Sequence, residues 1–255
     1  MCLIDRDARL VPVEVDDLGS AVAQVRRGDS GEDVPVRLVS AALFRGSSPW
    51  RTFGSRKGQG HYPGAYWSAV TGGHVPYESR LELSFLLFAD REPGARAIYA
   101  QPFRLVAAVR GRTRRHVPDF LVEKGDGGLT VVDVKPRRRL DDDEVRFTFG
   151  WTAGLAGMLG WGFEVFSEPE PGVLANVRFL SGYRRVRQFD PAVLEKALSL
   201  AGRPLPLADL EAAVAGVARS GPAARAHVLH LLWSGRLRAD LVRPLSGSTW
   251  VECSR

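Results

Sequence analysis

The sequence predicts an α/β protein in which a mixed sheet flanked by helices is followed by a smaller α+β domain. Two observations carry this prediction. Between residues 77 and 168 the hydrophobic patterns follow the order helix, strand, strand, strand, helix, strand. Beyond Pro171 the pattern changes to three amphipathic runs and one alternating run. The 255 residues are 45% hydrophobic and 25% charged, which is typical of a globular chain with room for two domains.

The charge balance favours an anionic partner such as nucleic acid. The net charge is +6 and the isoelectric point is about 9.7, although many basic proteins bind no nucleic acid. Two cysteines at opposite ends, Cys2 and Cys253, exclude a disulfide framework and a CxxC zinc site. The first twenty residues carry four Asp and one Glu, and no run approaches the ~18 apolar residues of a membrane span. We therefore expect a cytoplasmic protein without membrane contact.

Residues 1–69 are expected to form an extension of short β-like runs that ends in a basic and aromatic arm. In the arm, FRGSSPWRTFGSRKGQGHYPGAYW, cations alternate with rings among glycines and serines. Cations and rings together suit phosphate contact and base stacking, so Arg56 and Lys57 are candidate DNA contacts. A solvated loop whose rings pack on a neighbouring domain explains the same composition equally well.

Residues 70–170 are expected to form the main α/β core. The core begins with a largely buried helix over residues 77–90, because apolar residues recur there at helical spacing. Glu78 and Glu82 are one turn apart and share a face of this helix. The run RAIYAQPFRLVAAV then predicts a strand that is interrupted at Gln101.

The stretch HVPDFLVEKGDGGLTVVDVKP predicts two apolar strands joined by a Gly/Asp turn. Asp119 stands at the head of the first strand. Asp133 and Lys135 belong to the second strand, where alternation puts both on one face. A hairpin does not need two acids and a lysine near one point, so these residues raise the question of function.

The run LDDDEVRFTFGWTAGLAGMLGWG predicts a helix from residue 140, with three acids at its N-terminus where the helix dipole favours them. Phe147, Trp151 and Leu155 form its apolar ridge. Four glycines lower its intrinsic propensity, and we expect them to let the helix lie close to a sheet. The run FEVFSE predicts one further strand.

Residues 171–255 have a different character. DPAVLEKALSLAG, PLADLEAAVAGVA and GPAARAHVLHLLWSG predict three helices, and RLRADLVRPLSGSTWVE predicts a small hairpin. Three helices closed by a hairpin is winged-helix order, which is typical of DNA- or protein-docking modules. The third helix offers only Arg225 and two histidines to DNA, so protein docking fits as well.

The acids of the hairpin suit a divalent metal. Asp119, Asp133 and one glutamate of the preceding helix are expected to meet at the edge of the sheet. Gathered carboxylates repel one another unless a hard cation lies between them, and Mg²⁺ with its octahedral oxygen coordination fits. The metal polarises a phosphate and lowers the pKa of a bound water, while Lys135 orients that water or balances charge. The set predicts phosphodiester hydrolysis.

Pro118-Asp119 followed by Asp133-Val134-Lys135 matches the PD-(D/E)xK nuclease pattern. The pattern alone is degenerate, and its context sharpens it: a glutamate-bearing helix before, strand placement of the motif residues, and a helix after. The alternative is a surface hairpin with solvated Asp and Lys. VVDVK is too apolar for an exposed strand, which weakens that alternative.

ESRLELSFLL, AQPFRL, PDFLV and VVDVKP occur in that order, and with them residues 56–168 resemble the catalytic domain of TnsA-like transposon endonucleases. The tail resembles the C-terminal winged-helix-like domain of that family. The resemblance implies a restriction-endonuclease-like core that cuts the 5′ strand at transposon ends. It also implies double-stranded DNA as substrate, a DDE-type transposase as partner that cuts and joins the 3′ ends, and an AAA+ regulator as a further candidate partner.

The same resemblance implies roles for single residues. Glu82, Asp119 and Asp133 would hold Mg²⁺, with Mn²⁺ as a substitute, and Lys135 would be the catalytic lysine. Some members carry glutamine where Asp133 stands, so the ligand set here is closer to the general nuclease pattern. Gln101 matches the family's Gln-Pro feature and is expected to position the site.

Two assignments are weighed against alternatives. Helical periodicity does not separate Glu78 from Glu82, and only the position of the motif favours Glu82. Arg137 and Arg138 directly follow the lysine and are candidate contacts to the DNA backbone, with solvated charge as the alternative. The histidines of the third C-terminal helix are expected to be ordinary helix residues, because no acid or thiol completes a zinc set near them.

Two other functions remain open. One is a stand-alone nuclease of the same fold that acts on branched DNA or in defence. The other is a non-catalytic DNA-binding assembly subunit in which the acids are relics. The intact set of Glu82, Asp119, Asp133 and Lys135 argues against the second.

Overall fold

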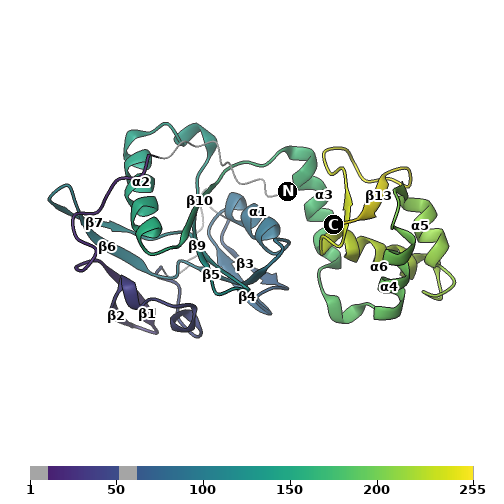
Figure 1. The fold of residues 1–255 in the computed structure, drawn as a ribbon, viewed down its shortest axis with the longest axis horizontal. Helices are drawn as coiled ribbons and strands as arrows, with labels where there is room; N and C mark the ends of the chain where they lie inside the picture. The colour runs from purple at the N-terminus through teal and green to yellow at the C-terminus, as the bar shows by residue number, and fades with distance from the viewer. Residues whose placement is uncertain (1–10, 52–61, 255) are drawn as a thin grey trace. The chain divides into compact units, whose positions relative to one another are not determined.

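The computed structural model describes residues 11–51 and 62–254, and these form a mixed α/β protein with several sheets and six α-helices (Figure 1). Arg56 and Lys57, the predicted DNA contacts of the arm, lie outside the described residues. No α-helix among the described residues is long and apolar enough to cross a membrane.

The chain divides into two compact units. The first unit is Met1–Ala89 with Gly94–Glu168, and the second is Asp90–Pro93 with Pro169–Arg255. Residues 11–51, which the sequence analysis set apart as an extension, belong to the first unit and supply two strands of one of its sheets.

The first sheet of the first unit is antiparallel and has the strand order β2-β1-β6-β7. Its strands are β1 (Val22–Arg27), β2 (Ser30–Pro35), β6 (Arg104–Val109) and β7 (Arg112–His116). Apolar residues of β1 and β6 face a buried cluster, in which they meet residues of the second sheet. The two sheets of the first unit therefore share one core.

The second sheet is mixed and has the strand order β10-β9-β8-β5. Its strands are β5 (Ala95–Ala100), β8 (Phe120–Lys124), β9 (Leu129–Val134) and β10 (Gly162–Phe166), with only β9 and β10 parallel. The predicted antiparallel pairing of β8 with β9 is confirmed. The GDGG turn between them has Gly127 at φ 85°, a conformation that glycine adopts readily.

Two helices pack on this mixed sheet. Phe85 of α1 (Arg80–Ala89) contacts Phe120 of β8 and Phe166 of β10, with ring centroids 4.8 and 5.6 Å apart. Trp151 of α2 (Asp143–Met158) packs in the buried cluster that includes β8 and β9 residues. Because α2 lies between β9 and β10 in the chain, these elements form a parallel β-α-β crossover. A two-stranded hairpin, β3 (Gly64–Ser68) and β4 (Gly73–Tyr77), precedes α1.

The interruption predicted at Gln101 in the run RAIYAQPFRLVAAV is confirmed, but the prediction of one strand is wrong, because the two sides are separate strands in two different sheets. β5 ends before Gln101, which has the left-handed backbone angle φ 42°. Phe103 follows and is fully buried, which holds the new chain direction. The sharp turn at Gln101 thus carries the chain from the mixed sheet to the antiparallel one.

α1 begins later than predicted, because β4 continues to Tyr77. The hydroxyl of Ser79 accepts from the N–H of Glu82 at 3.1 Å and donates to the Glu82 carboxylate at 2.8 Å. This reciprocal pair is a capping box that starts the helix. Glu78 precedes the helix, so the expectation that it shares a helical face with Glu82 is wrong.

Two glycines of α2 lie close to the N-terminal segment, whereas the sequence predicted that the glycines would lie close to a sheet. The N–H of Val13 donates to the carbonyl of Gly150 at 2.9 Å, and a Cβ on Gly150 would come within 2.9 Å of the Val11 carbonyl. A Cβ on Gly154 would collide with the Val13 carbonyl. These two glycines therefore allow residues 11–13 to lie directly on the helix.

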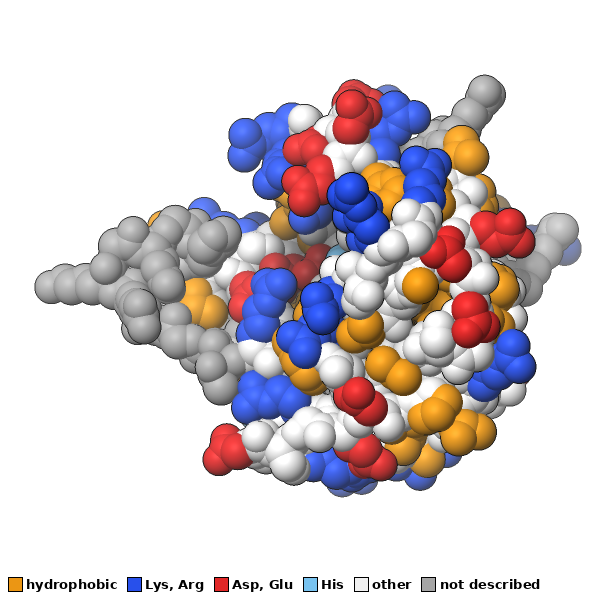
Figure 2. Space-filling view, turned by 90° about the vertical axis from the view of Figure 1, so that its left-hand side faces the viewer, with side chains coloured by type: hydrophobic (Ala, Val, Ile, Leu, Met, Phe, Trp, Pro, Cys, Tyr) orange, Lys and Arg blue, Asp and Glu red, His pale blue; other side chains and the backbone are white. Residues whose placement is uncertain are grey.

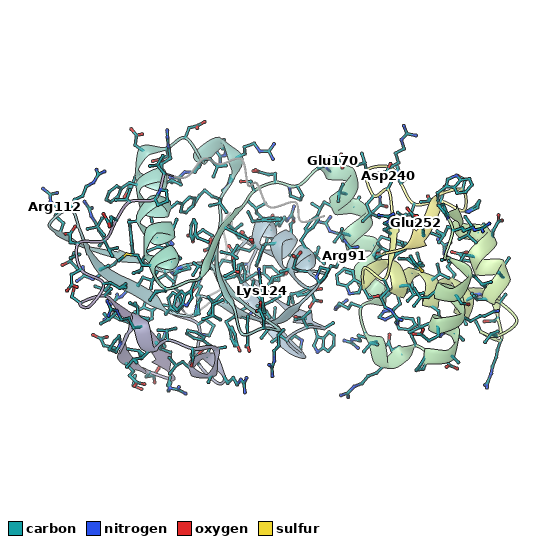
Figure 3. All side chains as sticks on the ribbon, viewed as in Figure 1. Arg91, Arg112, Lys124, Glu170, Asp240 and Glu252 are labelled. Atoms are coloured by element: carbon teal, nitrogen blue, oxygen red, sulfur yellow. The ribbon has the colours of Figure 1, made fainter. Side chains whose placement is uncertain are left out.

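The second unit contains four helices and a three-stranded sheet of order β11-β13-β12. The elements are α3 (Pro171–Leu180), α4 (Pro191–Leu200), β11 (Leu205–Pro206), α5 (Leu207–Val214), α6 (Gly221–Trp233), β12 (Leu237–Ala239) and β13 (Trp250–Cys253). The three predicted helices and the hairpin are confirmed. α3 was not predicted; it begins at Pro171, and Glu170 caps it by accepting from the N–H of Val173 at 2.7 Å (Figure 3).

The histidines of α6 are structural, as expected. His227 lies between the Ala223 carbonyl, 2.7 Å from Nδ1, and the N–H of Asp190, 2.9 Å from Nε2. His230 Nδ1 is 2.7 Å from the carbonyl of Tyr183, and burial lowers the pKa of His230. Both side chains thus hold the connection between α3 and α4 onto α6.

Candidate functional site

Asp119 lies in the connection between β7 and β8, where two backbone contacts hold it. The N–H of Val134, in β9, donates to Asp119 Oδ2 at 2.7 Å. The carbonyl of Asp119 accepts from the N–H of Gln101 at 2.8 Å. Asp119 is thus hydrogen-bonded both to β9 and to the turn at Gln101 that follows β5.

Asp133 is a buried residue of β9, 2% exposed, and it meets a histidine that the sequence analysis did not single out. Nε2 of His116 lies 2.8 and 3.0 Å from the two carboxylate oxygens of Asp133. His116 ends β7, and its ring packs edge-on against Trp151 with centroids 6.2 Å apart. The contact joins the antiparallel sheet to the mixed sheet at the predicted site.

Lys135 is the first residue after β9, and its main chain is held on both sides. Its N–H donates to the carbonyl of Phe166 at 2.9 Å, and its carbonyl accepts from the hydroxyl of Ser167 at 2.7 Å. The side chain therefore extends from a fixed backbone position. Its charge lies near enough to Asp119 to oppose the rise in that residue's pKa.

Glu82 also lies within electrostatic range of Asp119, because its charge helps to raise the pKa of that aspartate. Its own carboxylate oxygens accept from the N–H of Glu78 and the hydroxyl of Ser79, both at 2.8 Å. Glu78 forms a 3.7 Å ion pair with Arg51 instead. Glu82 thus lies near Asp119, while its carboxylate oxygens help to cap the start of α1.

The electrostatics of the cluster centre on Asp119. Burial, then the charge of Asp133, raise the pKa of Asp119 to about 7, with Glu82 adding to the rise and the Val134 N–H and Lys135 opposing it. Burial lowers the pKa of His116, but the Asp133 carboxylate outweighs burial, and the net shift is upward. The cluster gathers more acids than a buried site holds in ionised form without a cation.

The donor set fits a divalent metal in part. Asp119 and Asp133 supply the oxygen ligands that Mg²⁺ prefers. Across residues 11–51 and 62–254, no three His, Cys, Asp or Glu side chains stand close enough together to enclose an ion. Glu82 would reach a metal only through water or after leaving its helix cap, and Mg²⁺ usually keeps several waters. The two aspartates are therefore the residues that would hold it directly.

Gln101 connects the site to Trp50 and Arg51, which belong to the described part of the arm. Its side-chain oxygen accepts from the N–H of Arg51, and its carbonyl accepts from the N–H of Trp50, both at 3.0 Å. Its own N–H holds Asp119. With 3% exposure, this side chain has a structural task, which is consistent with a positioning role.

Arg137 and Arg138 follow Lys135 and are exposed. The N–H of Arg137 donates to the Glu168 carboxylate at 2.8 Å, and its guanidinium donates to the Glu168 carbonyl at 3.1 Å. Arg137 thus links the exit of β9 to the exit of β10. Both arginines remain candidate contacts to a phosphate backbone.

Figure 2 shows the end of the first unit that carries β6 and β7. The surface is hollowed there, with acidic side chains and a histidine in the hollow and Lys and Arg side chains on either side of it. A hollow with acids inside and cations around it is a form suited to a polyanion that must approach a metal site.

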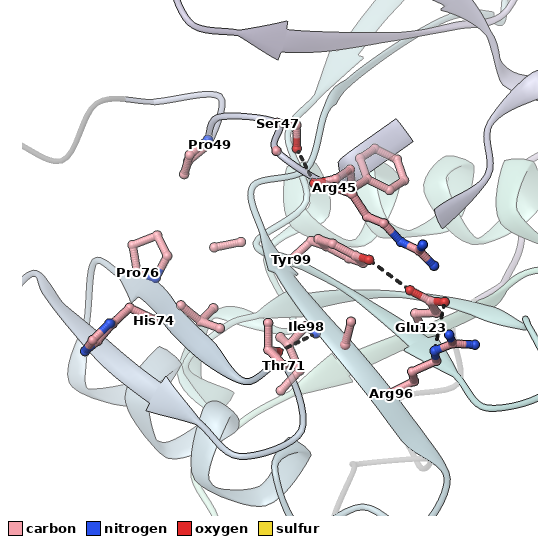
Figure 4. Close-up of a pocket in the computed structure, with 15 residues that line it drawn as sticks. Arg45, Ser47, Pro49, Thr71, His74, Pro76, Arg96, Ile98, Tyr99 and Glu123 are labelled. Atoms are coloured by element: carbon pink, nitrogen blue, oxygen red, sulfur yellow. Dashed lines mark hydrogen bonds and ion pairs between the residues drawn. The ribbon is translucent and has the colours of Figure 1, made fainter. Parts of the chain in front are cut away.

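A second concavity of about 530 Å³ lies in the first unit and does not include the acids of the site. It lies beside β5 and is lined in part by Arg45, Tyr99 and Glu123 (Figure 4). The Tyr99 hydroxyl donates to the buried Glu123 carboxylate at 2.8 Å, and Arg96 is 3.8 Å from the same group. The polar groups of this concavity thus largely satisfy one another.

His116 is the residue that the sequence reasoning missed. The available signal was its place three residues before Asp119, at the end of the polar run RTRRH. Alternation predicts the face of a strand, but it does not say which residue of another sheet that face will meet. A comparison of the chain with protein-family models gives no match, and a search among curated proteins gives none either.

Proposed function

We propose that the chain is a metal-dependent DNA endonuclease that hydrolyses phosphodiester bonds at the site of Asp119, Asp133 and Lys135. The observation that carries the proposal is the convergence of two aspartates, one directly before β8 and one in the neighbouring strand β9, beside a lysine with a fixed backbone. The 2.7 Å bond from the Val134 N–H to Asp119 brings the two halves of the motif together.

Mg²⁺, with Mn²⁺ as a substitute, would supply a Lewis acid that polarises the phosphate and lowers the pKa of a bound water. Asp119 and Asp133 would hold the ion, and Glu82 would bind it through water. Lys135 would place its ammonium against the scissile phosphate or the attacking water and balance the charge that develops there.

The architecture of the first unit supports its assignment to the restriction-endonuclease-like nucleases. The mixed sheet, with α1 and α2 packed on it, is the arrangement expected of a restriction-endonuclease-like core carrying the PD-(D/E)xK pattern. In the second unit, α4, β11, α5, α6, β12 and β13 follow one another in winged-helix order, and β13 is the central strand. We propose this unit as a winged-helix-like docking domain.

The role in transposition follows from the resemblance to TnsA-like endonucleases. On that basis the chain cuts the 5′ strand at transposon ends in cytoplasmic DNA, beside a DDE-type transposase and under an AAA+ regulator. The α6 side chains from His227 to Trp233 are buried, so this helix offers little surface to a DNA groove. We therefore propose that the second unit docks protein rather than reads DNA.

A non-catalytic assembly subunit is the second candidate. The occupied Glu82 oxygens and the contact of His116 with Asp133 favour it, because both engage groups that a metal would need. It predicts DNA binding without specific metal binding.

Calorimetry with Mn²⁺ and a short DNA duplex separates the two candidates. The nuclease predicts binding that Asp119→Asn and Asp133→Asn each abolish while circular dichroism stays native. Asp29→Asn, an exposed acid between β1 and β2, serves as the matched control and should leave the isotherm unchanged. If all four proteins bind Mn²⁺ equally, Asp119 and Asp133 do not form the metal site. The non-catalytic assembly subunit would then be the better candidate.

A further inference from the structure

The β6–β7 ribbon carries four arginines within six residues: Arg110, Arg112, Arg114 and Arg115. Its turn is formed by Arg110 and Gly111, at φ 52° and 70°, in the tight two-residue form that favours Asn and Gly. Both N–H groups donate to the carboxylate of Asp16, at 2.8 and 2.7 Å. An arginine thus occupies a turn position that its backbone preference does not explain.

Two of these arginines share one aromatic ring. The guanidinium of Arg114 lies 4.9 Å from the centroid of Phe147 in α2, and that of Arg110 lies 5.4 Å from it. No ion pair within residues 11–51 and 62–254 includes any arginine of the ribbon. Arg114 Nε is buried, and in that part of the chain it has no hydrogen-bond partner. Two adjacent guanidinium groups that form no ion pair present a positive charge that attracts an anion.

The ribbon leads directly into the candidate site. Successive β7 side chains alternate, so Arg112 and Arg114 lie on the same face as His116, which contacts Asp133. β1 pairs with β6 only over residues 104–106, so the ribbon continues beyond the sheet as two strands. Arg112 lies near its tip and points outward (Figure 3), on the end that Figure 2 views.

We propose that the β6–β7 ribbon, with Phe147 as a platform beneath its guanidinium groups, binds the phosphate backbone of duplex DNA beside the cleavage site. Guanidinium groups match phosphate oxygens in charge and in donor geometry. A two-stranded ribbon has the width that a DNA major groove admits. Contacts to phosphate fix the register of the duplex without reading its sequence. The ribbon thereby aligns a strand with Asp119 and Asp133, and only this last point depends on the proposed function.

The test measures the salt dependence of DNA binding by the full chain, with a short labelled duplex and fluorescence anisotropy. Arg112→Gln and Arg110→Asn each remove one charge, and asparagine suits the positive φ of the turn. Each variant is expected to lower the slope of log affinity against log salt concentration by about 0.9, and the double variant by about 1.8. The loss should be the same for duplexes of unrelated sequence.

Arg37→Gln is the matched control, because Arg37 is exposed at the opposite edge of the same sheet. It should leave the slope unchanged. Equal slopes for the control and the ribbon variants would overturn the proposal, and so would a loss seen with an RNA duplex but not with DNA. Mn²⁺ calorimetry on Arg112→Gln should match the native chain. The two proposals fail in different measurements. If the nuclease proposal is wrong, only the Mn²⁺ isotherm will differ from expectation. If the ribbon proposal is wrong, only the salt dependence of DNA binding will differ.

Discussion

Nε2 of His116 lies 2.8 and 3.0 Å from the two carboxylate oxygens of Asp133. The contact joins the last residue of β7, in the antiparallel sheet, to β9, a central strand of the mixed sheet. The aspartate is 2% exposed, so its charge has little access to water. A buried carboxylate needs a hydrogen-bond partner, and His116 is that partner. Asp133 is therefore both a proposed metal ligand and a residue on which the stability of the fold depends.

Replacement of His116 is expected to destabilise the fold. His116→Ala leaves Asp133 buried and unpaired, so the free energy of unfolding should fall by about 3 kcal/mol. His116→Gln keeps a hydrogen-bond donor, so the free energy of unfolding should fall by less than half as much. Urea unfolding checks both values, with His74→Ala, an exposed histidine of β4, as the control. Equal stabilities for the Ala and Gln variants would contradict the role of the hydrogen bond.

Asp119 is expected to make the stability depend on pH. Its pKa is about 7 in the folded chain and 3.8 in the unfolded chain. Only the folded chain keeps the proton between those values, so the contribution of Asp119 to stability is complete below about pH 4 and is lost as the pH rises through 7. Asp119→Asn should raise the free energy of unfolding by about 4 kcal/mol near pH 8 and change it little near pH 4.

Urea titrations with a chelator at the two pH values measure this difference. Added Mn²⁺ should reverse the order, because it stabilises the ionised aspartates of the native chain but not the variant. A stabilisation of the variant that is equal at both pH values would argue against a raised pKa.

Substitution can separate two roles of Glu82, the cap of α1 and the proposed binding of a metal through water. Glu82→Gln keeps an acceptor for Ser79 and should leave stability within about 0.5 kcal/mol of native. Ser79→Ala removes the cap and should cost about 1 kcal/mol. If Glu82 binds a metal through water, the Gln variant alone should weaken Mn²⁺ binding in calorimetry. Weaker binding by Ser79→Ala with native binding by Glu82→Gln would assign Glu82 to the helix cap only.

Two glycines of α2 provide a matched pair. Gly154→Ala would drive a methyl group into the Val13 carbonyl and should lower the free energy of unfolding by about 2 kcal/mol. A Cβ on Gly157 meets open space, so Gly157→Ala should raise stability by about 0.5–1 kcal/mol through helix propensity. Thermal unfolding monitored by circular dichroism distinguishes the two signs. Two stabilising results would mean that residues 11–13 do not hold their place on the helix.

Much of the candidate site could be predicted from the sequence, because its spacing is local. Asp119 directly precedes β8 and Asp133 lies on β9, and the antiparallel pairing of two strands joined by a tight turn needs no knowledge of the rest of the chain. Glu82 could be placed only on a helix, since helical periodicity carries no information on what a helix end contacts. The His116–Asp133 contact was out of reach, because β7 and β9 belong to different sheets.

The sequence by itself determined many elements of this protein: the β8–β9 hairpin, α2 with its acidic N-terminus, and α4, α5, α6 and the hairpin of the C-terminal unit. Short-range alternation, capping and turn residues encode these, and they act within a few residues of one another. Tertiary structure decided that β5 and β6 separate into two sheets and that residues 11–13 lie on α2. Those outcomes depend on which apolar faces pack together, and such packing joins segments about 80 to 140 residues apart.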